Sequence, residues 1–351
     1  RQAMLYSDIG QVVCMLVFLV YGYAEIDSLW PMFLLVFAAK TLMITFETVA
    51  TFQLIPALVA EKDLHEANSW FLSAHRLIQI VAPLVGGLLM SVFSVRACVI
   101  ANAISFAATL YFVLKMKNLD ELIEGDFPRR PDLELSLFAM LRSFKKSVVY
   151  TWRSSLFRPF ICMMFLWNLS SLCTNTPTLT YYFNEFNSFS PFQYGLIMSF
   201  IGLLGIAGFL LAPYLFRQYS FGWALNLSTL SMAIFGGFAT LSYHFPTGFV
   251  ILYALTRFGS SVLSMGTLVL RQTNIPRSMM GGVNSALRMF FMSAMPLSAY
   301  LQGVLITHYG VGTSFAIGTL CLFGCAYFAF RVSAAFTQHT AKSRSDFPRA
   351  A

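Results

Sequence analysis

The sequence contains ten long apolar runs, and their length is the feature that most limits the possible folds. Crossing the hydrocarbon of a bilayer takes about 20 apolar residues in a helix, whereas a spanning strand takes about 10 that alternate in polarity. The runs are too long for strands and do not alternate. They predict an all-α membrane protein with transmembrane helices at approximately residues 4–23, 30–52, 67–91, 97–114, 159–180, 193–215, 222–243, 247–270, 282–305 and 311–330.

The composition agrees with lipid as the main solvent and argues against several other classes of protein. Hydrophobic residues make up 57% of the chain and charged residues 11%, against roughly 25% charged in soluble domains. The net charge of +8 lies in short segments between the runs rather than in a nucleic-acid-binding stripe. The six cysteines fall within apolar runs and lack metal or redox spacings. We therefore expect no cofactor, metal site or nucleic-acid partner.

Enzymatic motifs are also missing from the sequence. It contains no His-Glu-x-x-His, paired aspartate or Gly-Lys phosphate-binding motif. A membrane-embedded enzyme would need such reactive side chains at a common depth. The sequence therefore predicts a protein that is not an enzyme.

The positively charged residues indicate the topology. If the chain begins in the cytoplasm, 18 of the 23 Lys and Arg residues fall in cytoplasmic segments and only Arg96 in an external loop. Because Lys and Arg are enriched on the cytoplasmic side of membrane proteins, this distribution predicts a multi-pass protein with both chain ends in the cytoplasm.

One long polar stretch, Lys115 to Arg158, divides the chain. It holds six acidic and nine basic residues, and it separates residues 1–114 from a second bundle at 159–330 and a tail at 331–351. Within it, Leu137 to Trp152 spaces apolar residues at helical intervals with basic residues between them. We expect an interfacial helix there, and the alternative is a linker helix with no lipid role.

An internal repeat suggests how many helices the fold has. Four runs precede the polar stretch and six follow it, and Asn68 and Gly87 of the third run recur as Asn284 and Gly303 of the ninth at the same spacing. In a duplicated 6+6 plan these runs become helices 5 and 11. We therefore expect ten of twelve transmembrane helices, with the first two missing by N-terminal truncation.

Four segments carry a resemblance to a known family. The end of a signature loop that leads into helix 3 is resembled by Arg1 with Met4–Asp8. A junction between helices 4 and 5 is resembled by Leu54–Val59 together with Leu64–Ser69. An antiporter motif is resembled by Ala82–Gly87. On these motifs the sequence resembles the major facilitator superfamily, in particular the bacterial branch of the enterobactin exporter and macrolide-efflux proteins. The resemblance implies two pseudo-symmetric helical bundles, efflux by an antiporter, and the bacterial inner membrane.

The same resemblance supplies candidate gating residues. Asp8 would lock the gate loop by pairing with an arginine. Pro83 removes one helical hydrogen bond, and Gly86 and Gly87 permit a close helix contact, so this segment could act as hinge and seal. Ala82 departs from the antiporter motif, in which a glycine usually precedes the proline.

A stripe of glycines in the sixth run could complement that hinge segment. Gly202, Gly205 and Gly208 recur at steps of three and offer a small-residue face to it. For these glycines and for those beside Pro83, the alternative is ordinary transmembrane packing.

Five ionisable residues lie well inside the predicted spans: Lys40, Glu47, Arg76, Arg257 and Arg288. Each costs roughly 2.5 to 3.5 kcal/mol to insert, so each should face protein or water. Glu47 and Arg76 lie at depths that allow an ion pair. Because four of the five are positive, the pathway should prefer an anion, with Lys40, Arg76 and Arg257 as contacts. The alternative for each cation is a carboxylate on another helix, and Arg288 can also snorkel to the cytoplasmic face.

Proton coupling and cavity lining complete the candidate site. Glu47 is the best proton carrier and His75 the second, although a lone membrane histidine can also be a packing residue. Asn168 and Asn175 make the fifth run unusually polar near Pro177, which predicts a cavity-lining helix.

We therefore expect a monomeric secondary transporter that works by alternating access. Its partners would be a small anionic, siderophore-like molecule, protons and membrane lipids, with the molecule exported in exchange for protons. The first alternative is broad drug or lysolipid efflux, and the second is a non-transporting membrane scaffold.

Overall fold

A computed structural model describes residues 2–23, 30–49, 64–115, 137–174, 176–275 and 279–345 of the chain, almost all of them in helices. All ten predicted apolar runs overlap helical segments, which confirms the all-α membrane class. Six of the described helices are long and apolar enough to cross a membrane. The total number of spans remains a prediction.

The chain divides into two compact units, Arg1–Leu133 and Glu134–Ala351. The predicted linker helix exists as α7, Leu137–Arg153, and belongs to the second unit. The finer domain bounds expected from the sequence stay a prediction.

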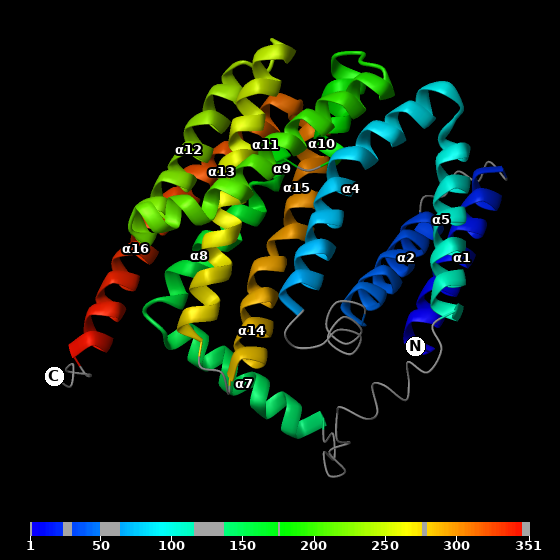
Figure 1. Ribbon diagram of the computed structural model, residues 1–351. Helices are drawn as coiled ribbons and strands as arrows, with labels where there is room; N and C mark the ends of the chain where they lie inside the picture. The colour runs from blue at the N-terminus through cyan, green and yellow to red at the C-terminus, as the bar shows by residue number, and fades with distance from the viewer. Residues whose placement is uncertain are drawn as a thin grey trace. The chain divides into compact units, whose positions relative to one another are not determined.

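The first unit contains α1 (Gln2–Tyr23), α2 (Trp30–Val49), α4 (Leu64–Val92) and α5 (Val95–Lys115). Helix α1 packs against both α2 and α5, and α4 packs against α5. The hydroxyl of Ser7 donates to the Leu42 carbonyl and so joins α1 to α2. Figure 1 shows that α4, which contains Pro83, bends before it reaches α5. Proline removes one backbone hydrogen bond and commonly bends a helix.

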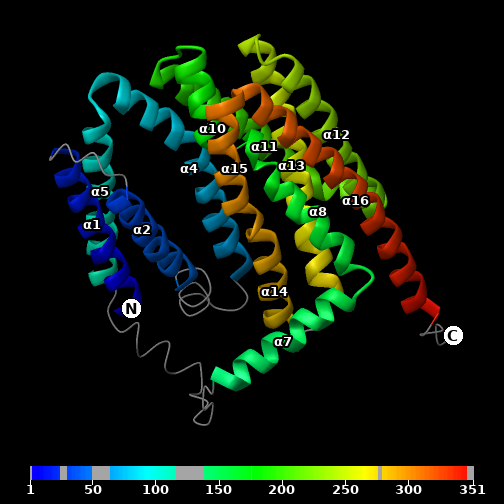
Figure 2. The ribbon, with the colours of Figure 1, turned by 180° about the vertical axis from the view of Figure 1, so that it is seen from behind.

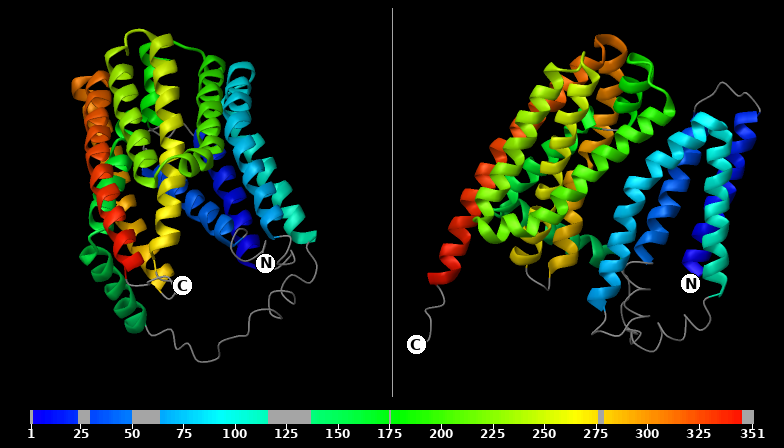
Figure 3. Two further views of the ribbon diagram at one scale, coloured as in Figure 1. Left: turned by 60° about the vertical axis from the view of Figure 1, so that its left-hand side comes forward. Right: turned by 45° about the horizontal axis from the view of Figure 1, so that its top comes forward.

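The second unit is a larger bundle, shown from behind in Figure 2 and from two further sides in Figure 3. Helix α11 packs on α13, α12 packs on α13 and α16, and α16 packs on α8. After α7 its elements are α8 (Phe157–Leu169), α9 (Ser171–Thr174), α10 (Thr176–Thr180), the π-helix η3 (Tyr181–Phe186), α11 (Pro191–Gln218), α12 (Phe221–Leu241), α13 (Pro246–Asn274), α14 (Met280–Met292), α15 (Ala294–Tyr309) and α16 (Val311–Ser345).

Local sequence signals fix several helix ends in this unit. Ser190 and Gln193 form a reciprocal capping box at the start of α11: the Ser190 hydroxyl accepts from the Gln193 N–H at 3.2 Å and the Gln193 side chain accepts from the Ser190 N–H at 2.8 Å. Gly310 separates α15 from α16 with φ of 82°, a conformation that favours glycine. These signals fix the start of α11 and the boundary between α15 and α16.

The core of the second unit has two parts. One is a hydrophobic cluster that includes Phe160, Met163 and Phe291. The other is a mainly aromatic cluster around Tyr182, Phe249 and Phe315. Together they surround α8, α9, α10 and η3, which follow one another along a single irregular path through the bundle.

Candidate functional site

The path from α8 to η3 is the most irregular part of the described membrane helices. Helix α8 ends at Leu169, a turn at Ser170 leads to α9, and α10 passes directly into the π-helix η3. Interrupting a helix frees backbone carbonyls, which need partners when water is absent. Two side chains meet this need locally: the Ser170 hydroxyl donates to the Trp167 carbonyl at 2.6 Å, and the Asn168 amide donates to the Met164 carbonyl at 2.8 Å.

Two further partners come from distant parts of the sequence. The carbonyl of Leu172 accepts hydrogen bonds from the Ser314 hydroxyl at 2.9 Å and from the Thr178 hydroxyl at 3.0 Å. The side-chain amide of Gln302 donates to the Thr178 hydroxyl. Thr178 and Ser314 are fully buried, and Gln302 is 4% exposed. This buried network ties the interrupted path to α15 and α16.

A second irregularity lies beside the first interruption. Helices α14 and α15 form one apolar stretch with a local irregularity at Ser293, which keeps helical backbone angles and donates its N–H to the Met289 carbonyl at 3.1 Å. In the first turns of α15, the hydroxyl of Ser298 lies 2.8 Å from that of Ser171 in α9. Discontinuous membrane helices commonly line the substrate sites of transporters, because their free backbone groups can bind polar solutes. The break at Ser170 and the irregularity at Ser293 therefore form the candidate site.

The η3 end of the interrupted path is anchored by aromatic packing. The ring of Tyr182 in η3 lies 4.5 Å from that of Phe249 and 5.3 Å from that of Phe315. Its hydroxyl donates to the carbonyl of Tyr243 at 2.6 Å. Because Tyr182 is fully buried, the η3 end of the path is held firmly in the core. The end near Ser170 lacks this aromatic anchor.

Arg257 is the notable charge of the second unit. It is exposed on α13, with its guanidinium 6.0 Å from the ring centre of the buried Tyr253. From Leu137 to Ser345 the sequence contains a single carboxylate, Glu185. Glu185 follows Tyr182 by one turn in η3, near the start of α13, whereas Arg257 lies about 16 Å further along α13 from Pro246. Among the described residues of this unit, Glu185 is the one carboxylate, and it lies at a different depth from Arg257.

The predicted pathway residues of the first unit lie on α2 and α4. Lys40 is exposed on α2, and its ammonium is 4.0 Å from the Met43 sulfur. Glu47 is on α2, and His75 and Arg76 are on α4, but the side chains of these three lie outside the described part of the structure. The Glu47–Arg76 ion pair therefore stays a prediction. Asn175 also lies outside the described residues.

The predicted gating residues occupy different surroundings. Asp8 is 1% exposed, and within the described residues its Oδ2 atom has no hydrogen-bond partner. Pro83 and Gly86 are half-buried and Gly87 is buried on α4. A side chain at Gly86 would meet no described atom within 4 Å. Arg288 is exposed on α14. Their gating roles remain predictions.

The glycines of α11 have a structural role inside the second unit. A Cβ added at Gly208 would overlap the backbone carbonyl oxygen of Phe258 and lie 3.1 Å from the Phe258 Cα, and one at Gly205 would lie 3.5 Å from the Ser261 hydroxyl. The small-residue face proposed from the sequence thus contacts α13.

The sequence marked the polar part of the fifth run, which contains Asn168 and Thr178, but not the side chains of other helices that bond to it. Ser171, Ser298, Gln302 and Ser314 are spread over three helices, and none is charged. Gln302 offered one signal, because it is the most polar uncharged side chain of its apolar stretch.

Discontinuous helices joined by buried side-chain hydrogen bonds are a feature found in multi-pass transporters. A family model described as Major Facilitator Superfamily matches residues 1–299, so the chain belongs to that superfamily. It is accordingly a transporter and not an enzyme. A search of curated proteins finds no match.

Solved structures of several transporters share the fold. A bacterial homologue of the iron transporter ferroportin in an inward-facing state aligns with a TM-score of 0.68 at 18% identity, over 93% of this chain and 82% of that chain. A POT family transporter in complex with 5-aminolevulinic acid gives 0.68 at 14% identity, over 97% and 82%. The nucleoside transporter NupG gives 0.58 at 14% identity, over 94% and 83%. At these identities the likeness establishes the fold.

Proposed function

We propose that the protein is an exporter of a small anionic solute, siderophore-like in its charge, which it exchanges for protons by alternating access in the bacterial inner membrane. The helix interruptions of the second unit form the polar lining of the transport pathway. Asn168 and Asn175, in the segment from α8 to α10, contribute to this lining. The direction of transport and the compartment are inferred from the exporter-like motifs of the sequence. The protein acts as a monomer with both ends in the cytoplasm.

The observation that carries the anionic substrate is Arg257. A charged side chain in the middle of a membrane helix must face protein or water, and normally it pairs with an opposite charge. Among the described residues of the second unit, the one carboxylate, Glu185, lies at a different depth. An anionic solute supplies the missing negative charge, and the adjoining Tyr253 ring holds the guanidinium in place by a cation–π contact.

The first unit supplies the complementary parts of the mechanism. Lys40 and Arg76 extend the positive potential that attracts an anion. Glu47 carries the exchanged proton, with His75 as the second candidate, because a carboxylate in a weakly polar site can titrate near neutral pH.

Replacing Arg257 by glutamine should lower transport of a catecholate anion at least ten-fold, measured in everted membrane vesicles and normalised to the amount of folded protein. Arg257→Lys, which keeps the charge, should retain a substantial part of the rate. Arg217→Gln is the matched control, because Arg217 is exposed at the end of α11 and is predicted to lie in the cytoplasm.

Three outcomes would contradict the proposal. If Arg257→Gln transports the anion as fast as wild type, Arg257 has no part in binding it. If the vesicles move lipophilic cations and no anions, the protein is a drug exporter, and if they move neither while Lys40, Glu47 and Arg76 tolerate alanine together, it is a scaffold.

A further inference from the structure

Helix α7 is docked on the second unit by one face only. Ser147 and Thr151 on that face are buried, and a side chain at Gly282 of α14 would collide with the Ser147 hydroxyl. The Trp152 ring lies 5.9 Å from the Phe290 ring of α14. Helix α7 is therefore firmly attached beside the starts of α8 and α14, as Figure 1 shows.

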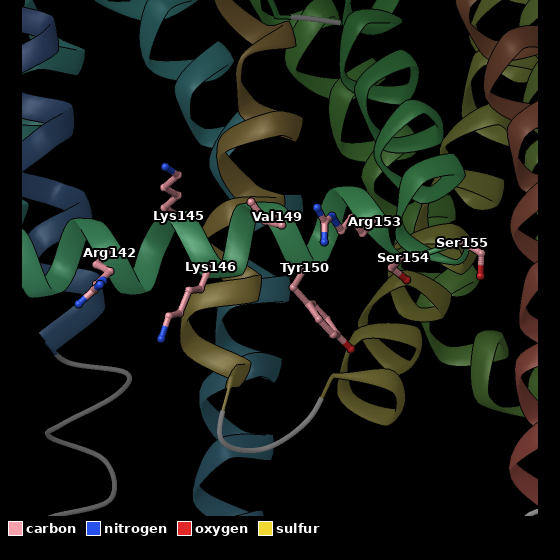
Figure 4. Close-up of a pocket in the computed structure, with 8 residues that line it drawn as sticks. All are labelled: Arg142, Lys145, Lys146, Val149, Tyr150, Arg153, Ser154 and Ser155. Carbon is pink, nitrogen blue, oxygen red and sulfur yellow. The ribbon is translucent and has the colours of Figure 1, made fainter.

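The opposite face of α7 is a row of cations. Arg142, Lys145, Lys146 and Arg153 are all exposed, and helical geometry places them within an arc of roughly 100°. Figure 4 shows their side chains reaching away from α7, with Val149 among them. These residues line a pocket of about 790 Å³. We call these four residues the α7 basic face.

Helix α7 itself carries no negative charge, and the nearest acidic residues before it, Asp132 and Glu134, lie outside the described residues. No Asp or Glu occurs between Leu135 and Asn184. Apolar groups are mixed with the cations, since Val149 is 40% and Trp152 53% exposed. A helix with exposed cations and large apolar or aromatic groups beside them is typical of a membrane interface, where the cations meet headgroups and the apolar groups enter the acyl boundary.

The position of α7 fits this interface. It lies where α8 and α14, two apolar segments, begin. Anionic lipids give the cytoplasmic surface of a membrane a negative potential, and each Lys or Arg near that surface gains about 1 kcal/mol from it. The basic distribution of the sequence assigns this end of the bundle to the cytoplasm.

We propose that the α7 basic face is a binding site for the headgroups of anionic phospholipids of the cytoplasmic leaflet. The lipid phosphates lie against Arg142, Lys145, Lys146 and Arg153, and Val149 and Trp152 contact the adjoining acyl chains. Bound lipid then fixes α7, and with it α14, at the membrane surface. This proposal is independent of the substrate.

Native mass spectrometry of the purified full chain tests the site. Phosphatidylglycerol should bind at least ten-fold more tightly than phosphatidylcholine, and the preference should shrink as salt rises, because exposed charges are screened. Lys145→Gln together with Lys146→Gln should weaken phosphatidylglycerol binding roughly 30-fold, about five-fold for each cation.

The matched control is Arg217→Gln together with Arg331→Gln. These two arginines are also exposed and belong to the same unit, so the control removes the same charge elsewhere. It should change lipid affinity less than two-fold. All variants should keep the wild-type melting temperature in detergent, since the changed side chains are exposed.

Three results would overturn the proposal. The first is equal wild-type affinity for the two lipids. The second is an equal loss in the control, which would show that only net charge matters. The third is a preference for phosphatidylglycerol that appears only after Asp120, Glu121, Glu124 and Asp126 are neutralised, because the acidic segment of this chain would then be the occupant of the face.

Discussion

Replacing Gly208 by leucine should leave almost no folded protein in the membrane. At this position α11 and α13 are in such close contact that even a methyl group would overlap the Phe258 carbonyl oxygen. Backbone cannot move aside as a flexible side chain can, so the helices would have to separate. We expect the unfolding free energy to fall by roughly 3 kcal/mol, a large part of the stability of an ordinary protein.

The measurement is the yield of monodisperse protein after mild detergent extraction, together with its melting temperature. Gly303→Leu is the matched control, because Gly303 also lies inside a membrane helix but has no described atom within 4 Å of an added Cβ. The control should be extracted like wild type. Normal yield of the Gly208 variant would show that α11 and α13 do not make this contact.

Replacing Gln302 by leucine should lower transport at least ten-fold while most of the protein stays folded. The substitution keeps the approximate size of the side chain but removes its hydrogen bond to Thr178, one of the buried bonds that hold the interrupted path to α15. The Thr178 hydroxyl keeps its hydrogen bond to the Leu172 carbonyl but loses its bond to α15. We expect the path to shift relative to α15, which disturbs the site.

The control for this variant is Thr319→Val. Thr319 lies 2.8 Å from the Thr240 hydroxyl and joins two regular helices, α12 and α16, away from the interruptions. It should lose similar stability and keep its transport rate. Equal rates for wild type and the Gln302 variant would show that the interrupted path has no role in transport.

Much of the fold could be predicted because membrane helices are specified by length and hydrophobicity alone. The run at 159–180 illustrates the limit: it was expected as one helix, and the structure divides it at Ser170 and continues it through Phe186 as a π-helix. The division depends on Gln302 and Ser314, whose hydrogen bonds come from far along the chain. Local sequence could not show these partners.

The candidate site was predictable only where charge was involved. Arg257 could be recognised because inserting a guanidinium into the membrane costs much free energy. Burying the hydroxyls of Ser171 and Ser298 costs little free energy, so the sequence gave no signal for them. For Gly205 and Gly208, the spacing revealed that another helix comes close, but it could not show that this helix is α13. The spacing of the glycines shows which face of α11 they share. Which helix packs against that face depends on the tertiary structure.

The account's central claim is that Arg257 faces a water-filled pathway that an anion enters. The most direct test uses an Arg257→Cys variant in which the six native cysteines are replaced. Its single thiol is labelled with a charged reagent that does not cross the membrane. We predict rapid labelling that a transported anion slows. Position 257 would instead lie on the lipid-facing perimeter if it reacted only with a lipophilic reagent and anions gave no protection.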